Sequence, residues 1–385
     1  MSLRRVSLRS TMRHTAATAA TLLLAISFVA AWTAAANTAK QSVTRQQPAA
    51  KRQRERKLKV SPASAPASSS PAPRDGANAP DEDDDVVRVD TSLTNVLLTA
   101  VDKDRRFVTT LKREDVRLLE NGQPQEISLF ERETNLPLSL ALLLDASKSQ
   151  ERTLPDEQSA ARDFVERVLR PAKDSMTVIS FNAEPTSEQS LTDDKAKLRA
   201  AIDRVKIELP PDNPECRNTG DVPVDEDPRC WTGIWDSLWI TVNEVLSQTP
   251  ERTRRAVILL SDGEDTSSAT KRQEAIDFAV RHNVVVYSIG IGEREYYGMN
   301  EGALRKVAEQ TGGRAFFPVS KPELDAAFAQ IEQELRAQYL ISYTPSNKQR
   351  DGSFRQLKIE IVNPELRKQK MRLLYRQGYY AKSRG

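Results

Sequence analysis

The sequence predicts an α/β fold with a doubly wound, mostly parallel sheet, together with a small β domain. Residues 134–338 contain four nearly continuous apolar runs, which are typical of parallel strands buried on both faces. The runs are LSLALLLD, SMTVISFN, AVILLSD and VVVYSIGIG. Amphipathic stretches lie between them, namely SAARDFVERVLR, DKAKLRAAIDRV, GIWDSLWITVNEVL and RQEAIDFAVRHN. This alternation of strand and helix predicts a sheet that carries helices on both faces.

The two segments that flank this region predict the small β domain. Residues 86–133 contain VRLLENGQPQEISLF, which we interpret as two extended runs around an Asn121-Gly122 turn. Residues 339–385 contain LKIEIV and MRLLY, in which apolar residues alternate as they do along a half-buried strand. Because neither segment has enough strands for a core of its own, we expect the two segments to pair into one domain.

The first 85 residues predict an export segment and a linker. Residues 1–36 join four arginines to a charge-free stretch centred on TLLLAISFVAAW, which is the layout of a secretory signal peptide. The stretch would remain as a membrane anchor if it were not cleaved after Ala36. Either outcome places the rest of the chain outside the cytoplasm, so we expect an exported protein that is periplasmic, at the cell surface or secreted. Residues 37–85 have the composition of a disordered linker.

Composition and motifs argue against several function classes. The net charge of +3 gives no overall field directed at nucleic acid or at a membrane surface. The two histidines, His14 and His282, fall in the export segment and in a predicted helix, so we expect no histidine-based catalytic centre. The sequence also lacks a Gly-rich phosphate loop, a G-x-S-x-G motif and an H-E-x-x-H motif. We therefore expect that the protein is not an enzyme.

Oxygen-bearing side chains follow two of the buried runs. Asp145, Ser147 and Ser149 come at the end of the first run, and Asp262 comes at the end of the third. Ligands of an open α/β sheet bind beyond the carboxyl ends of its strands, so we expect these side chains to lie at one site. Oxygen donors with few carboxylates suit a hard cation, which predicts Mg²⁺, with Mn²⁺ or Ca²⁺ as alternatives. Taken alone, D-x-S-x-S is also a common spacing in turns and helix caps.

Three motifs in order carry a resemblance to a known family. LLLDASKS, WTGIWDSL and VILLSDGEDT resemble the von Willebrand factor type A (VWA) domain with its metal-ion-dependent adhesion site. The resemblance covers residues 136–338 and implies a Rossmann-like fold, with a partner's carboxylate completing the metal shell. The metal set that it implies is Asp145, Ser147, Ser149, Thr232 and Asp262. The flanking β segments and the ending RQGYYA resemble, more widely, exported bacterial VWFA-related proteins common in acidobacteria.

An acidic insertion precedes Thr232 and contains the two cysteines, Cys216 and Cys230. Two nearby thiols in an oxidising compartment predict a disulfide, and the surrounding sequence offers no further Cys or His to complete a zinc site. The family usually has small residues before the Thr, where this chain has Cys230-Trp231. That departure makes Thr219 a rival of Thr232 for the fifth ligand.

Two charged residues beside the ligand set are further candidates. Lys148, between the two serines, is either a solvated side chain or a group that favours an acidic partner by charge. Asp236 is a candidate for orienting the loop that carries Thr232.

The resulting hypothesis is an exported, metal-dependent, adhesion-type module that binds an exposed Asp or Glu of an unknown partner protein through a Mg-type ion. The first alternative is a metal-independent scaffold that works through the β domain. A Mg-assisted hydrolase is ranked below it, because the sequence offers a cation but no general base. We expect no nucleic acid as partner, and contact with a membrane only through an uncleaved N-terminal anchor.

Overall fold

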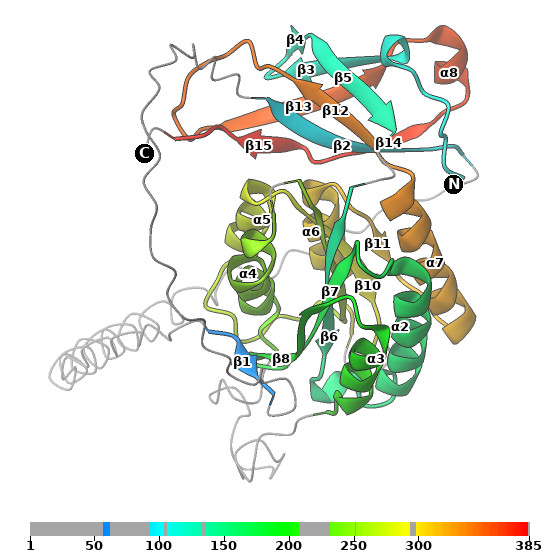
Figure 1. Cartoon of the computed structure of the whole chain (residues 1–385), viewed down its shortest axis with the longest axis vertical. Helices are drawn as coiled ribbons and strands as arrows, with labels where there is room; N and C mark the ends of the chain where they lie inside the picture. Colours follow the sequence, from blue (N-terminus) through cyan, green and yellow to red (C-terminus); the bar gives the residue numbers. More distant parts are fainter. Residues whose placement is uncertain are drawn as a thin grey trace, which may run out of the picture. The chain divides into compact units, whose positions relative to one another are not determined.

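The computed structural model describes residues 57–61, 93–103, 106–132, 136–207, 232–250, 252–292 and 298–383 (Figure 1). The predicted signal peptide or anchor, most of the linker and the insertion with Thr219, Cys216, Cys230 and Trp231 lie outside the described residues. In the part that is described, no helix is both long and apolar enough to cross a membrane.

The main sheet has seven strands in the order β1-β8-β7-β6-β9-β10-β11. These strands are β1 (Lys59–Val60), β6 (Leu138–Asp145), β7 (Ser175–Phe181), β8 (Pro185–Thr192), β9 (Arg254–Ser261), β10 (Val284–Gly290) and β11 (Ala315–Phe316). The central strand β6 is buried along its whole length and pairs in parallel with β7 and β9. The four predicted apolar runs form β6, β7, β9 and β10, so the predicted α/β fold class is confirmed.

Helices cover both faces of this sheet. They are α2 (Leu154–Val168), α3 (Lys195–Arg204), α4 (Ile234–Glu244), α5 (Arg272–Arg281), α6 (Glu301–Thr311) and α7 (Lys321–Arg336). Successive residues of a strand point to opposite faces, so Leu140 and Leu142 of β6 pack with α2, α3 and α7. Ala141 and Leu143 pack instead with α4, α5 and α6. Burial on both sides explains why β6 shows no polar alternation.

One strand of the main sheet departs from the predicted pattern. Strand β8, with the sequence PTSEQSLT, is not among the predicted strands and runs antiparallel to β7. Among the described residues, the two-residue strand β1 is the one strand beyond β8, and β8 accordingly lacks the continuous apolar run of a central strand. Strand β11 and helices α6 and α7 were also not predicted.

The two flanking segments form the small β domain. It has two four-stranded antiparallel sheets, in the orders β14-β2-β12-β5 and β15-β13-β3-β4. The strands are β2 (Thr94–Val101), β3 (Val116–Glu120), β4 (Gln123–Gln125), β5 (Ile127–Arg132), β12 (Tyr339–Tyr343), β13 (Phe354–Ile361), β14 (Arg372–Leu374) and β15 (Gly378–Tyr380), with the short helix α8 (Pro364–Lys368) before β14. Each sheet combines strands from both segments, as the fold class predicted, around a shared core that includes Leu98, Leu118, Ile341 and Ile359.

The Asn121-Gly122 turn is present, but the run that follows it is divided. Both residues have positive φ (48° and 81°), which a two-residue hairpin turn requires, and Glu120 pairs with Gln123 across it. The expected second run breaks at Glu126. Its first part, β4, pairs with β3, whereas β5 pairs with β12 in the other sheet.

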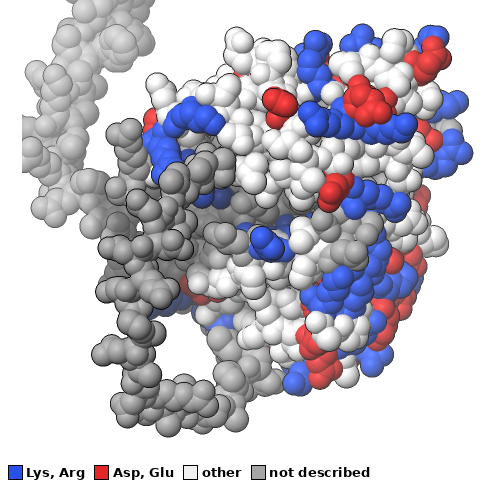
Figure 2. Space-filling view, turned by 45° about the horizontal axis from the view of Figure 1, so that its top comes forward, with Lys and Arg blue, Asp and Glu red and all other residues white. Residues whose placement is uncertain are grey.

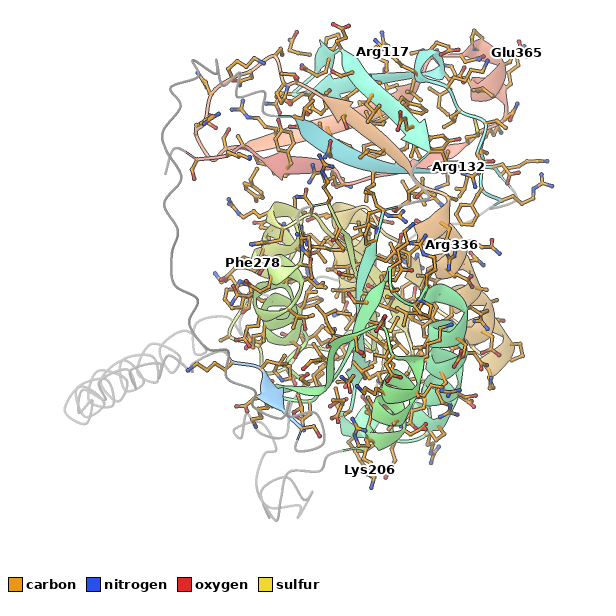
Figure 3. All side chains as sticks on the ribbon, in the orientation of Figure 1. Arg117, Arg132, Lys206, Phe278, Arg336 and Glu365 are labelled. Carbon is orange, nitrogen blue, oxygen red and sulfur yellow. The ribbon has the colours of Figure 1, made fainter. Side chains whose placement is uncertain are left out.

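Long-range contacts tie the elements together. Arg336, the last residue of α7 (Figure 3), donates to the carbonyls of Arg167 and Val168 (3.2 and 3.0 Å), which the C-terminal end of α2 leaves unpaired. Between the α/β body and the β domain, the Arg281 guanidinium lies 3.6 Å from the centre of the Tyr380 ring. Arg376 also donates to the Asn283 side chain of the α/β body.

A buried carboxylate on α7 makes stability depend on pH. Burial raises the pKa of Glu334 from its ordinary 4.5 to about 7, against the opposing charge of Arg314, whose Nη2 lies 3.4 Å away. Between about pH 4.5 and pH 7, Glu334 therefore holds a proton in the folded chain that it has released in the unfolded chain. The stability contributed by Glu334 is fully present below about pH 4.5 and is lost as the pH rises through about 7.

We therefore expect Glu334→Gln to flatten the pH dependence of stability. Between pH 5 and pH 8, its free energy of unfolding should fall by about 2 to 3 kcal/mol less than that of the wild type, because Gln cannot ionise. Denaturant unfolding at the two pH values measures this difference. Glu309→Gln, which alters an exposed side chain, is the control, and equal slopes for all three proteins would contradict the assignment.

Candidate metal centre

The candidate centre lies where two neighbouring parallel strands end. Asp145 is the last residue of β6 and Ser261 is the last residue of β9, and the two strands pair directly. Parallel strands bring their carboxyl ends to the same edge of a sheet. The polar sequences after the two strands, predicted as one site, therefore lie beside each other.

Asp145 is held rigidly at the base of the centre. Its side chain is fully buried, Oδ1 accepts the Ser147 N–H (3.0 Å), and Oδ2 accepts the Ser261 hydroxyl (2.6 Å). Burial, followed by the negative charge of Asp262, raises the pKa of Asp145 to about 7. The carboxylate is thus fixed in position by its hydrogen bonds to Ser147 and Ser261.

The two serines and Asp262 lie close to one another. The Ser147 and Ser149 hydroxyls lie 3.1 Å apart, and Gln150 donates from Nε2 to the Ser149 hydroxyl (3.3 Å) and to the Ile291 carbonyl (3.2 Å). Burial raises the pKa of Asp262, and the hydroxyl of Ser149 partly offsets this effect. The structure thus brings together Asp145, Ser147, Ser149 and Asp262.

Thr232 lies on a loop fastened to the segment that follows Asp262. The Thr232 N–H donates to the Thr266 hydroxyl (2.9 Å), and the Thr266 N–H donates to the Thr232 carbonyl (2.9 Å). The next residue, Gly233, packs so tightly that a Cβ atom there would lie 2.7 Å from the Ala183 carbonyl oxygen. Thr232 is therefore held next to the segment that follows Asp262.

The two additional candidates, Lys148 and Asp236, both make polar contacts in the structure. Lys148 is exposed and forms an ion pair with Glu151 (2.5 Å), so its charge is partly balanced at the surface. Asp236 accepts the N–H groups of Ala269 and Thr270 (2.8 and 2.9 Å) and so orders the turn before α5. Asp265 holds the residues that follow Thr232, because it accepts the Ile234 N–H (2.8 Å) at the start of α4.

The donor chemistry fits a hard divalent cation. Within the described ranges, no three His, Cys, Asp or Glu side chains are grouped as metal ligands. The centre offers the carboxylates of Asp145 and Asp262 with neighbouring hydroxyls, a set that suits Mg²⁺ with retained waters. Two like charges buried close together are costly without a cation, and the charge of Asp262 accordingly raises the pKa of Asp145.

A further buried carboxylate, which the sequence did not reveal, lies near the two carboxylates of the centre. Glu157 of α2 is fully buried, and neither of its carboxylate oxygens has a hydrogen-bond partner among the described residues. The nearby Thr153 hydroxyl donates to Gln150 instead (3.0 Å). Burial raises the pKa of Glu157 to about 8, and the charges of Asp145 and Asp262 contribute to the rise. Glu157 is therefore a further buried acidic group that interacts electrostatically with Asp145 and Asp262.

Sequence reasoning also missed Gln150 and Ser261. Both touch the ligand side chains through hydrogen bonds to Ser149 and Asp145. Ser261 stands directly before Asp262 in the sequence, so its position at the strand end was visible. Its contact with Asp145 depends on the pairing of β6 with β9, which the sequence alone does not reveal.

We expect Ser261→Ala to weaken binding of Mn²⁺ roughly 10- to 100-fold, because it removes the hydrogen bond that orients the Asp145 carboxylate. Titration of Mn²⁺ followed by electron paramagnetic resonance measures the affinity. The control is Ser139→Ala, which alters another buried serine near the start of β6, at the opposite end of this strand from Asp145. Equal affinities for the two variants would show that Ser261 does not position Asp145.

Comparisons with known proteins give distant structural similarities. No protein-family model matches the chain, and no curated protein does. Among solved structures, the chain is similar to proximal thread matrix protein 1 from the mussel byssus, at 19% identity and a TM-score of 0.43, over 56% of this chain and 51% of that one. The chain thus spans about half the length of that protein. A further structure of the mussel protein is described as having a zinc-occupied MIDAS motif.

Two bacterial structures are also similar. BatB from Bacteroides thetaiotaomicron matches at 16% identity and a TM-score of 0.38, over 51% of this chain and 98% of that one. A von Willebrand factor type A structure from Catenulispora acidiphila matches at 13% identity and a TM-score of 0.42, over 76% and 73% of the two chains. VWA proteins are therefore among the solved structures to which this chain is similar.

Proposed function

We propose that this chain is an exported, metal-dependent protein-binding module that binds an exposed carboxylate of a partner protein through a divalent cation. The observation that carries the proposal is the pair of buried carboxylates, Asp145 and Asp262, beside the Ser147 and Ser149 hydroxyls at one sheet edge. Export is supported by the charged and then apolar N-terminal sequence.

The residues around the centre support binding rather than catalysis. Asp145, Ser147, Ser149, Thr232 and Asp262 would hold the ion, which would supply an electrophilic position for an incoming carboxylate. His282, the histidine within the described ranges, lies at the end of α5 with its Nδ1 2.8 Å from the Phe278 carbonyl oxygen. The hydroxyls of the centre are engaged with each other and with carboxylates, an arrangement that suits coordination.

The charged surface is compatible with a protein partner. In the view of Figure 2, basic and acidic side chains both occur over the described surface, with uncharged areas between them. A net charge of +3 over 385 residues adds no strong general attraction for nucleic acid. Specific coordination of one carboxylate is therefore the better-supported mode of recognition.

A small-molecule probe tests whether the ion accepts a carboxylate. The protein is loaded with Mn²⁺, and water-proton relaxation is measured as N-acetyl-aspartate methylamide is added. We expect relaxation enhancement to fall, because the carboxylate displaces water from the ion. The matching asparagine compound should leave it unchanged. Equal responses to the two compounds, or none to either by a fully loaded protein, would refute a carboxylate-binding function.

A further inference from the structure

A second surface, separate from the metal centre, lies between the α/β body and the β domain. It is a cleft of about 1160 Å³, formed by α6, β11 and α7 on one side and by β13, β14 and the end of β2 on the other. None of the five predicted metal-set residues lines it. A ligand in this cleft would therefore not depend on the cation.

The cleft is built between firmly connected parts. Ala337 and Gln338, which join α7 to β12, are both buried, so the connection does not lie free in solvent. The two parts are also in contact through the Arg281–Tyr380 stacking and through Arg376, which donates both to Asn283 and to the Asn95 carbonyl. These contacts hold the walls of the cleft in a defined arrangement.

Two open sheet edges line the cleft. Strand β11 is the last strand of the main sheet and pairs with β10, and strand β14 is the last strand of its sheet and pairs with β2. Among the described residues, no further strand is hydrogen-bonded to the outer side of either one. An open edge presents alternating N–H and C=O groups, which an extended peptide can pair with.

The cleft is also positively charged. Its lining contains six Lys or Arg residues and three Asp or Glu residues. Three of the cations, Lys103, Lys370 and Arg372, are exposed and form no ion pair with another described residue. Arg305 is partly neutralised by Glu301 (3.0 Å) and lies 4.3 Å from the centre of the Phe317 ring. The unbalanced charge favours an anionic ligand.

We propose that this cleft binds an extended, acidic peptide segment of a partner protein as an added β-strand. The open edges distinguish this ligand from a polyanionic polysaccharide or nucleic acid, which has no regular backbone pattern to pair with them. Side chains of a strand alternate between two directions. The segment should therefore alternate acidic residues, which meet Lys370 and Arg372, with apolar residues that pack near Phe316 and Leu373.

Fluorescence anisotropy with the full chain tests the proposal. The probe is a labelled seven-residue peptide of alternating Glu and Val. The comparison peptides are a Gln–Val version and a Glu–Val version N-methylated at alternate amides. We expect saturable binding of the Glu–Val peptide that chelator does not change, and weak binding of the other two. N-methylation leaves charge intact and blocks backbone pairing, so it isolates the strand addition.

Charge reversal in the protein is the second test of peptide binding in the cleft. The double variant Lys370→Glu/Arg372→Glu should weaken binding of the Glu–Val peptide about tenfold or more. The control Lys206→Glu reverses an exposed charge outside the cleft lining (Figure 3) and should leave binding unchanged. Three results would overturn the proposal: no binding of the Glu–Val peptide, equal binding of the N-methylated peptide, or heparin binding that exceeds peptide binding.

Discussion

Asp145→Ala is expected to abolish saturable binding of Mg²⁺ and Mn²⁺ by this chain. Asp145 is fully buried at the end of β6, and its contacts to Ser147 and Ser261 fix its carboxylate in position. Removing one of two carboxylates from a small oxygen site leaves too little negative charge to compensate for dehydration of the ion. Calorimetric titration should show binding near a 1:1 ratio for the wild type and none for the variant.

The control for this experiment is Asp156→Ala, which removes an exposed carboxylate from the first turn of α2, only a short distance along the chain. Its affinity for Mg²⁺ should stay within about twofold of the wild-type value, because an exposed charge at this range is screened. If Asp145→Ala bound the ion as well as Asp156→Ala does, the metal centre would have to lie elsewhere.

Gly313→Ala is expected to cause the largest loss of stability. A Cβ atom at this position would lie 2.1 Å from the Val286 carbonyl oxygen and 2.9 Å from its carbonyl carbon. Both are backbone atoms of the buried strand β10, so no side-chain rotation relieves the overlap. We expect the free energy of unfolding to fall by about 3 kcal/mol or more. Denaturant unfolding measures the change.

Gly302→Ala is the matched control for this substitution. Gly302 is exposed on α6, and the nearest atom to an added Cβ is the Asn300 Oδ1 at 3.8 Å. Alanine favours the helical conformation, so this variant should gain up to about 1 kcal/mol of stability. Opposite signs for the two Gly-to-Ala changes are the expected result. A neutral Gly313→Ala would mean that β10 and the segment before β11 are not packed as described.

The predictable parts of the fold are the strands whose burial on both faces requires a continuous run of apolar residues. Strand β6 is almost entirely apolar because helices cover both of its faces. The sequence LSLALLLD therefore predicts a buried strand without a structure. Strand β8 could not be predicted from the sequence, because backbone groups make its pairing with β7 and its side chains are largely polar. The division between β4 and β5 likewise depends on which sheet each half joins.

The same distinction applies to the metal centre. Asp145, Ser147 and Ser149 were predictable because they follow a buried strand at fixed spacing. Glu157 was not, because a glutamate in the first turn of a helix is ordinarily solvated, and only the packing of α2 against the sheet buries it. Asp265, which caps α4 from a distant loop, shows the same limitation: the contact joins residues that are 31 positions apart.

The most direct test of the metal centre is a crystal structure of the protein grown with Mn²⁺, with the ion located by its anomalous scattering. We predict one strong peak beside the carboxylates of Asp145 and Asp262 and within coordination distance of the Ser147 and Ser149 hydroxyls. A peak only at some other place on the chain, or no peak at a saturating Mn²⁺ concentration, would contradict the account.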